Sequence, residues 1–335
     1  MVNNYMKSLV QKVPVIRKAN SAYYYFRRSM WRWHPRFIDD NNTVIDKPVF
    51  LLGTQGGGLT LLSRILHRHP QAISVTGNCN YWAGDDESQN VLNDILPERL
   101  SWRSIEIDTY NSKDHNWLYA NDAFLPFYRE NGSDVSEELK KQYKSILRRI
   151  INLYGKGSRG GGRFIDKSQS LTVRVGLIRK LLEGCNPKFV LITRNPFALA
   201  WRAVTKDDVI SNLEMTDQDK FKVAVQHWKN SMECVLEDGK ADDLGVWKFE
   251  DLLSQPEKII SEICEHIELP YISSILPGPD DVIPWGSMFD AFSKRKWYPL
   301  RPNVSSGYLD DIPDWAVQYL SQECRELLIR FGYHV

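Results

Sequence analysis

The sequence predicts an α/β fold in which a parallel sheet is flanked by helices. Three observations support this prediction. Short apolar runs such as Pro48 to Leu52 are typical of strands that are buried on both faces. Segments with helical periodicity separate these runs, and right-handed crossovers through such helices build a parallel sheet. A glycine cluster, Gly56 to Gly58, joins the first run directly to the first helical segment.

The elements of the first half follow in order along the chain. After the glycines, Leu61, Leu62, Ile65 and Leu66 recur at one-face helical spacing, and residues 72–75 form a second candidate strand. Between residues 78 and 130 periodicity is weak and aromatic residues are frequent, which predicts an aromatic-rich insertion. These aromatic side chains either fill a small core or form a stacking platform for sugar rings. A helix is expected over 136–153, with Ser136 as its N-cap.

Regular alternation resumes after the glycine-rich loop GKGSRGGG at 155–162. We predict three further strands, at 163–167, 188–193 and 246–252. Helices are expected at 173–184, closed by Gly184, at 217–237, at 254–269 and at 314–331. In the third of these helices, Ser254 and Glu257 have capping-box spacing.

The glycine cluster has the build of a phosphate-binding loop. Its glycines allow positive φ, and successive N–H groups can point at an anion held at the start of the following helix. Gly53, Gly58 and Thr60 match the spacing of the P-loop, but Leu59 stands where that motif has lysine. A nucleoside triphosphatase needs this lysine, so ATP hydrolysis is disfavoured. A tight turn that binds no ligand remains the alternative.

Composition limits the partners of the chain. Its 335 residues are 42% hydrophobic, enough for a full core. With 43 basic and 42 acidic residues the net charge is +1, so we expect no nucleic-acid partner and a strictly local anion site.

The five cysteines lie far apart and form no C-x-x-C pair, which indicates reduced thiols and neither a zinc site nor a disulfide framework. His67 and His69, two residues apart on a helix, are interpreted as cations near its C-terminus, and we expect no metal.

Residues 1–46 are predicted to be an N-terminal extension to a single domain over 47–335. This extension contains neither a continuous apolar stretch for a membrane span nor a signal-peptide core, so we expect no transmembrane segment and a cytoplasmic location. The cluster from Tyr23 to Trp33 is interpreted as a packing arm, with peripheral contact to a membrane surface as the alternative.

Polar residues follow three of the predicted strands at the point where each ends. They are the loop from Gly53 to Thr60, the segment Asp166–Lys167–Ser168, and the segment Thr193–Arg194–Asn195. Because parallel strands bring their carboxyl ends to one edge of the sheet, these residues should meet there. An anion-binding loop, one lysine and one arginine suit a ligand with two separated anionic groups.

Four segments resemble motifs of the sulfotransferases in the same order along the chain. FLLGTQGGGLTLLSRILHRHP is similar to the 5′-phosphosulfate loop, usually G-T-P-[RK]-S-G-T-T-L-L. KFVLITRNPFALAWRAV is similar to the 3′-phosphate motif, usually R-[ND]-P followed by a serine eight residues after the arginine. FIDKSQS, which lies between these two segments, and KFEDLLSQPEKIISEICEHIELP, which follows them, resemble two further motifs, and the resemblance runs from about Lys47 to the C-terminus.

This resemblance implies transfer of a sulfuryl group from PAPS, 3′-phosphoadenosine 5′-phosphosulfate, to a hydroxyl or amine of a small molecule, glycan or lipid. It implies that the backbone of Gly56, Gly57, Gly58, Leu59 and Thr60 holds the 5′-phosphosulfate, and that no metal is needed. Arg194 would hold the 3′-phosphate and Lys167 would neutralise charge near the transferred group. Arg295 and Lys296 would close over the nucleotide or form a solvated turn.

The sequence departs from the family pattern at several of these positions. Gly56 replaces the usual lysine or arginine of the loop, and Gly57 replaces its serine. Arg202 stands at the serine of the 3′-phosphate motif, where it can still contact that phosphate. No glutamate follows the second strand directly. The general base is therefore open, with His115 as one candidate and with Asp85, Asp86 and Glu87 closer to the loop.

Alternatives remain for single residues and for the whole protein. Lys167 could be a surface lysine and Arg194 the partner of a carboxylate, while Glu250 and Asp251 are interpreted as hydrogen-bonding the backbone at a helix entry rather than as catalytic groups. Two hypotheses stand for the whole protein. The first is an active sulfotransferase in which Arg202 or Lys167 replaces the lost loop cation, and the second is a protein of this fold that binds nucleotide or glycan without catalysis. A small-molecule kinase is a third hypothesis.

Overall fold

The computed structural model describes residues 43–75, 87–97, 118–129, 133, 135–155, 162–206, 209–240, 242–278, 300, 302 and 304–334. The predicted N-terminal extension lies almost wholly outside these residues, as do Cys79, Asp85 and Asp86. The boundaries of the predicted domain and of its insertion stay predictions.

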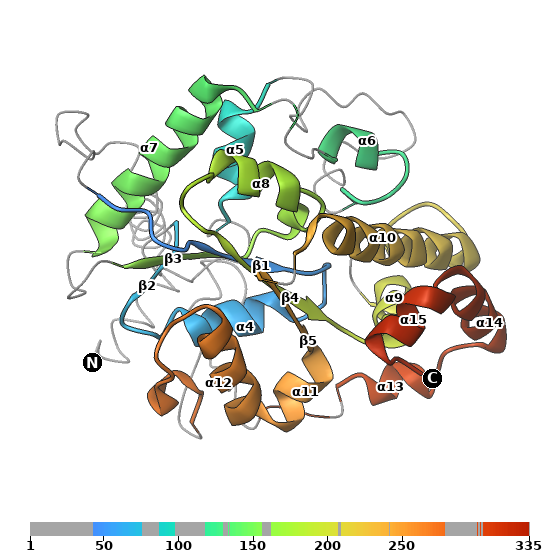
Figure 1. Cartoon of the computed structure of the whole chain (residues 1–335). Coiled ribbons are helices and arrows are strands. Elements are labelled where there is room, and N and C mark those ends of the chain that lie inside the picture. The colour runs from blue at the N-terminus through green and yellow to red at the C-terminus, as the bar shows by residue number, and fades with distance from the viewer. Residues whose placement is uncertain are drawn as a thin grey trace, which may run out of the picture.

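The centre of the fold is a sheet of five parallel strands (Figure 1). In chain order the strands are β1 (Val49–Leu52), β2 (Ala72–Ile73), β3 (Arg163–Asp166), β4 (Lys188–Thr193) and β5 (Leu244–Lys248), and across the sheet they lie in the order β2-β3-β1-β4-β5. The predicted parallel sheet flanked by helices is confirmed. From β1 the chain first builds one side of the sheet and then the other, so β1 marks the switch point where ligands bind in such folds.

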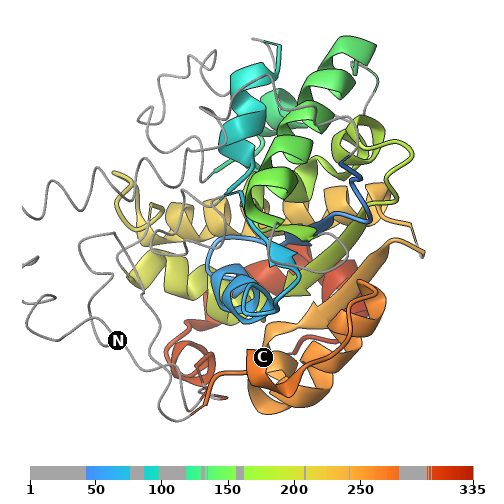
Figure 2. The same ribbon diagram turned by 90° about the vertical axis from the view of Figure 1, so that its left-hand side faces the viewer.

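Helices cover both faces of the sheet, which explains why its strands are mostly apolar. Phe50 and Leu52 of β1 point into the larger core, while Val49 and Leu51 point into a second one, and all four side chains are fully buried. In Figure 2 the green α7 and the orange α12 lie on opposite sides of the molecule. Alternate side chains of β1 therefore pack into two different cores.

The smaller core lies under α4 (Leu59–Leu66), α11 (Phe249–Ser254) and α12 (Pro256–His266) (Figure 1). The larger core is formed with α5 (Gln89–Ile95), α6 (Leu125–Tyr128), α7 (Glu137–Tyr154), α8 (Val175–Leu181), α9 (Pro196–Thr205) and α10 (Asp217–Asp238). The C-terminal segment adds α13 (Ser306–Leu309), α14 (Asp314–Glu323) and α15 (Arg325–Phe331). Two short 3-10 helices, η5 (Gln169–Val173) and η6 (Ser273–Ile275), complete the described elements.

The predicted helix at 136–153 is confirmed together with its cap. The Ser136 hydroxyl accepts a hydrogen bond from the backbone N–H of Leu139 at 3.1 Å. The apolar face bearing Tyr143, Leu147 and Ile150 is buried, as its periodicity indicates. The cap and the buried face together fix where α7 begins and which side it presents to the sheet.

Three predicted boundaries are wrong. The strand expected at 246–252 ends at Lys248, and Phe249 already begins α11. Ser254 is the last residue of α11, so it cannot cap α12; its hydroxyl donates to Asp251 O at 3.3 Å, and α12 starts without a side-chain cap. The helix expected at 314–331 is two helices, because the backbone leaves helical geometry at Cys324.

The predicted insertion contains helices α5 and α6 where only irregular structure was expected. Tyr119, Phe124 and Tyr128 are buried in the larger core, so the core-filling interpretation is confirmed for these aromatic residues. The four described cysteines, Cys185, Cys234, Cys264 and Cys324, form no disulfide, as predicted for them. Among the helices that the structure describes, none combines the length and the apolar character that crossing a bilayer requires.

Candidate active site

The glycine cluster forms a loop that runs from the carboxyl end of β1 into α4. Gly56 and Gly58 have φ angles of 73° and 101°, in the left-handed region that other residues rarely adopt. Gly58 directly precedes α4, and the Gly57 N–H donates to Thr54 O at 3.0 Å within the loop. A Cβ atom on Gly58 would lie 2.2 Å from Cδ2 of Phe249, so space as well as backbone angle requires glycine there.

Two buried hydroxyls hold the start of this loop. The Thr172 hydroxyl oxygen accepts from the Gly53 N–H at 2.9 Å, and its own O–H donates to Gly53 O at 3.1 Å. The Tyr119 hydroxyl also donates to Gly53 O, at 3.3 Å, and burial raises the pKa of Tyr119, which keeps this donor neutral. These contacts link the loop to η5 and to the insertion. The sequence predicts neither the Thr172 contact nor the Tyr119 contact with the loop.

Arg194 reaches from the end of β4 to the same loop. Its Nη1 donates to Gly56 O at 2.9 Å, its Nε donates to the Ser305 hydroxyl at 3.2 Å, and its guanidinium carbon lies 5.2 Å from the centre of the Phe249 ring. Among the described residues none of its hydrogen bonds goes to a carboxylate. Its Nη2 is buried without a partner there. One N–H group of Arg194 is thus available to an anion.

Arg202 approaches Gly56 from α9. A Cβ atom on Gly56 would lie 2.9 Å from Nη1 of Arg202, so the guanidinium occupies the space beside this glycine. Burial chiefly, and the nearby Arg202 charge in addition, lower the pKa of Arg194, while Glu250 opposes the shift. Two like charges therefore converge on one residue of the loop, an arrangement that a bound anion would stabilise.

Glu250 organises the surroundings of Arg194. Its Oε1 accepts from the Asn195 N–H at 3.0 Å and from the Ser305 hydroxyl at 3.2 Å, and its Oε2 accepts from the Tyr333 hydroxyl at 3.4 Å. The prediction that Glu250 hydrogen-bonds the backbone is confirmed. It connects the start of α9 to α13 and to the C-terminal residues, and so fixes where Arg194 lies.

Lys167 forms an ion pair with Glu87 at the end of β3. Nζ of Lys167 lies 2.7 Å from Oε1 of Glu87, and the two side chains are 2% and 4% exposed. The interpretation of Lys167 as a surface lysine is therefore wrong. The neighbouring Asp166 accepts from the backbone N–H groups of Ser88 and Ser168 at 2.8 and 3.1 Å, which joins the start of α5 to this strand end.

Of the predicted site residues, the structure brings both Arg194 and Arg202 to Gly56. Gly57, Gly58 and Thr60 lie in the same loop and first helical turn. The Leu59 side chain is buried in the smaller core, so only its backbone can face a ligand. His115, Arg295 and Lys296 lie outside the residues that the structure describes.

Both ring nitrogens of His69, near the end of α4, are engaged in hydrogen bonds. Nδ1 of His69 accepts from the Gln71 N–H at 3.1 Å while its Nε2 lies 3.1 Å from Pro270 O, to which it must donate. This arrangement needs the neutral ring, and burial lowers the pKa of His69. The interpretation of His69 as a cation is wrong. In the part of the chain that the structure describes, no three His, Cys, Asp or Glu residues gather as a metal site would require.

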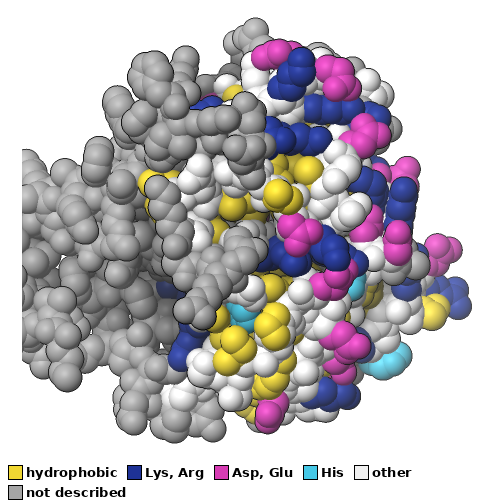
Figure 3. Space-filling model, turned by 60° about the vertical axis from the view of Figure 1, so that its left-hand side comes forward, with side chains coloured by type: hydrophobic (Ala, Val, Ile, Leu, Met, Phe, Trp, Pro, Cys, Tyr) yellow, Lys and Arg dark blue, Asp and Glu magenta, His cyan; other side chains and the backbone are white. Residues whose placement is uncertain are grey.

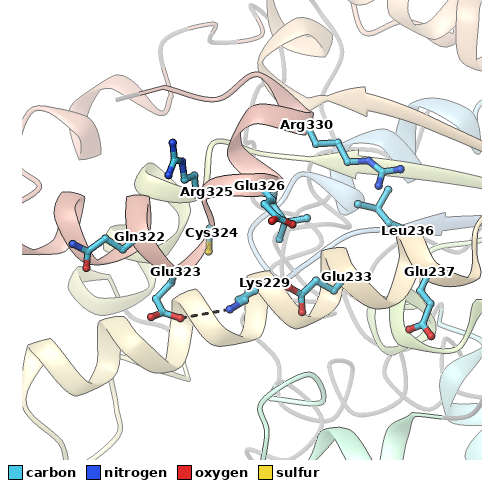
Figure 4. A pocket seen from close by; sticks show the side chains of 11 residues that line it. Lys229, Glu233, Leu236, Glu237, Gln322, Glu323, Cys324, Arg325, Glu326 and Arg330 are labelled. Carbon is cyan, nitrogen blue, oxygen red and sulfur yellow. Dashed lines mark hydrogen bonds and ion pairs between the residues drawn. The ribbon is translucent and has the colours of Figure 1, made fainter.

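A separate cavity of about 760 Å³ lies between α10 and the α14–α15 segment (Figure 4). Four glutamates and three basic residues line it. Two of these seven, Lys229 and Glu323, form an ion pair at 3.5 Å. This mixture of charge does not suit a polyanion, unlike the loop at β1.

The surface likewise offers no broad anion-binding area on the side that Figure 3 shows. Basic and acidic side chains of the described residues are interspersed over this face, with apolar side chains between them. The pattern agrees with a net charge of +1. The described residues of this face therefore add no broad attraction for an anion to that of the cations at the loop.

Comparisons with known proteins agree with this geometry. A model of the Sulfotransferase family matches residues 48–273, about two thirds of the chain. Among curated proteins, no sequence matches the chain. The structure of the sulfotransferase domain from the curacin biosynthetic pathway is 15% identical with a TM-score of 0.51, and the match covers 87% of this chain and 99% of that one. The sulfotransferase domain from the Synechococcus PCC 7002 olefin synthase is also 15% identical with a TM-score of 0.51, covering 87% and 97%. At this identity the structural likeness shows the fold alone.

Proposed function

The chain belongs to the Sulfotransferase family, and from this premise we propose that it transfers a sulfuryl group from PAPS to a hydroxyl or amine of an acceptor. The observation that supports the proposal best is the meeting of two guanidinium groups, those of Arg194 and Arg202, with a glycine loop at the carboxyl end of β1. Such a set attracts a ligand that carries several negative charges at a short spacing.

The residues present fit this ligand. The backbone from Gly56 to Thr60 would hold the 5′-phosphosulfate, since Gly56 and Gly58 adopt the left-handed backbone angles of an anion-binding loop and α4 begins directly behind it. Arg194 would bind the 3′-phosphate through its Nη2, the buried N–H group without a partner among the described residues. Leu59 offers no cation, which argues against the triphosphate chemistry of a kinase.

PAPS supplies the sulfuryl group: the acceptor oxygen bonds to sulfur, the bond from sulfur to the 5′-phosphate oxygen breaks, and its electron pair stays on the phosphate. The proton of the acceptor hydroxyl must leave to a base. Glu87 is the described carboxylate proposed for this role, because it pairs with Lys167, which directly follows β3, the strand beside the loop-bearing strand β1. Lys167 would orient it through the 2.7 Å ion pair. His115 remains the candidate from the sequence.

The acceptor is proposed as a small molecule, a glycan or a lipid with a free hydroxyl or amine, and the location of the protein as cytoplasmic. A second candidate function, nucleotide binding without transfer, follows from one observation. Gly56 carries no side chain where the loop of the resembling enzymes has a cation, and loss of one group that stabilises transition-state charge slows catalysis by roughly 100- to 1,000-fold.

Calorimetric titration with adenosine 3′,5′-bisphosphate and with ATP, each with and without magnesium, tests the proposal. We expect the bisphosphate to bind without magnesium, and Arg194→Ala to abolish this binding. Lys206→Ala removes a cation at the end of the same helix α9 and is the matched control. No binding of the bisphosphate would sink the proposal, and magnesium-dependent binding of ATP would favour a kinase.

Transfer of labelled sulfate from PAPS to a panel of glycans, lipids and phenols separates the two candidate functions. Turnover on any acceptor establishes the transferase, whereas tight bisphosphate binding with no turnover across the panel supports the binding protein. Glu87→Gln keeps the shape of the side chain and should lower kcat by about 100-fold or more with little change in nucleotide affinity. A loss of both to the same degree would instead make Glu87 part of the nucleotide site.

A further inference from the structure

The space beside Gly56 is filled by another part of the chain. A Cβ atom on this glycine would lie 2.9 Å from Nη1 and 3.6 Å from Cζ of Arg202, and 3.0 Å from Cδ1 of Leu199. A lysine or arginine at position 56 and Arg202 in its present conformation would therefore overlap. The two arrangements are alternatives: a cation carried by the loop, or a cation brought to the loop from α9.

From this geometry we propose that Arg202 is the catalytic cation of the loop, placed against the 5′-phosphate that leaves when the sulfuryl group is transferred. The inference rests on the proposed function. The position of Arg202 in the sequence motif suggests contact with the 3′-phosphate. The inference assigns it to the 5′-phosphate instead.

Helix α9 holds Arg202 firmly enough for this role. The helix begins at Asn195, whose Oδ1 accepts from the Phe197 and Ala198 N–H groups at 3.0 and 3.4 Å. Its apolar face, from Phe197 to Val204, is buried in the larger core against α10. Arg202 lies two turns beyond the start of the helix, on a rigid element rather than on a loop.

The neighbouring charges agree with this assignment. Arg194 donates to Gly56 O at 2.9 Å and still has its Nη2 for a second anionic group, so the 3′-phosphate has a partner without Arg202. Lys167, the other candidate for the missing cation, is buried in its 2.7 Å pair with Glu87. A guanidinium offers two parallel donors to a phosphate, and their attraction grows as charge accumulates on the leaving oxygen.

Nucleotides with and without a 3′-phosphate test the placement. We measure the affinities of adenosine 3′,5′-bisphosphate and adenosine 5′-monophosphate for the wild type, Arg202→Ala, Arg194→Ala and the control Lys206→Ala. Arg202→Ala should weaken both ligands by a similar factor, about 10- to 100-fold. Arg194→Ala should weaken only the bisphosphate, and the control should change neither. Steady-state kinetics should show kcat reduced by about 100-fold or more in Arg202→Ala.

A relocated cation provides the second test. In the double variant Gly56→Lys with Arg202→Ser, a lysine on the loop takes the space that the guanidinium leaves, although the φ of 73° at position 56 strains an L-residue. We expect kcat to recover by about 10-fold or more over Arg202→Ser alone despite this strain. Arg202→Lys, which keeps a charge without the planar fork, should fall between the wild type and Arg202→Ala. Circular dichroism and thermal unfolding verify that each variant folds, and Arg202→Lys serves if the alanine variant does not.

The outcomes are separable. If the wild type binds neither nucleotide, the proposed function fails and the inference with it. If the wild type is active but Arg202→Ala retains its kcat, or weakens only the bisphosphate, the proposed function stands and the role of Arg202 is refuted. Equal weakening of both nucleotides together with rescue by Gly56→Lys supports it.

Discussion

Substitution of Gly58 by alanine tests the packing beneath the glycine loop. The added Cβ would lie 2.2 Å from the ring of Phe249, and the backbone has a φ of 101°. The backbone angle costs about 1–2 kcal/mol for an L-residue, and forcing a methyl group into packed space adds about 1–3 kcal/mol. We therefore expect Gly58→Ala to lower the free energy of unfolding by about 2–5 kcal/mol. Nucleotide affinity should fall as well, because Arg194 lies 5.2 Å from the centre of the same ring.

Urea denaturation measures the effect, and two other glycines separate its causes. Gly184 has a φ of 84° with nothing within 4 Å of an added Cβ, so Gly184→Ala should show the backbone cost alone. Gly307 also has open space and lies inside α13, so Gly307→Ala should be neutral or slightly stabilising. Phe249→Leu combined with Gly58→Ala should recover part of the steric cost. If Gly58→Ala lowers the free energy of unfolding no more than Gly184→Ala does, the Phe249 ring does not exclude a side chain at position 58.

Glu250→Gln should lower the free energy of unfolding by about 1–2 kcal/mol, because this carboxylate accepts three hydrogen bonds. The variant should also bind nucleotide more weakly, while kcat changes less than about 10-fold because Glu250 contacts no reacting group. A 100-fold fall in kcat would instead make Glu250 a catalytic residue. Burial lowers the pKa of His227 from 6.5 to about 3, so the unfolded chain takes up a proton below pH 6.5 while the native state does not, and stability falls with pH. Acid titration of unfolding should show a loss of about 2 kcal/mol between pH 7.5 and pH 5 that His227→Leu removes, and an unchanged pH profile in this variant would contradict the assignment. Thr172→Val removes both hydrogen bonds to Gly53 and should cost about 1–3 kcal/mol, more than Tyr119→Phe, which removes one; urea denaturation that ranks them the other way would show that Thr172 is not the main support of the loop.

The strands could be predicted because the sheet is covered on both faces. β1 and the central residues of β4 are buried on both faces, so these stretches are apolar and are followed by polar residues. β5 lies at the edge of the sheet, and its residues are only partly buried, so the apolar signal gives no sharp end at Lys248. The predicted start of α12 is wrong for a different reason. Ser254 is a residue type that caps helices, but in the structure it is the last residue of the preceding helix, α11.

The site could be predicted only where its parts are consecutive in the sequence. The loop from Gly53 to Thr60 and the Arg194 segment follow strands directly, and sheet topology alone places them at one edge. The partners of these segments come from far along the chain: Glu87 is 80 residues from Lys167, and Thr172 is 119 residues from Gly53. No local pattern predicts such pairs, because they depend on how helices and loops pack after the sheet has formed.

The loop carries no cation of its own at either position where related loops have one. Position 59 faces the smaller core, where a lysine would be buried without a partner, and the space beside Gly56 holds the Arg202 guanidinium. Positive charge must come from neighbouring elements, as it does when Arg194 contacts Gly56 across 138 residues of sequence. Binding of an anion then joins β1, β4 and α9, so nucleotide should stabilise the fold cooperatively, by about 2.7 kcal/mol at a concentration of roughly 100 times Kd. In Arg202→Ala the same ligand concentration should stabilise less, by about 1.3 kcal/mol for a tenfold loss of affinity.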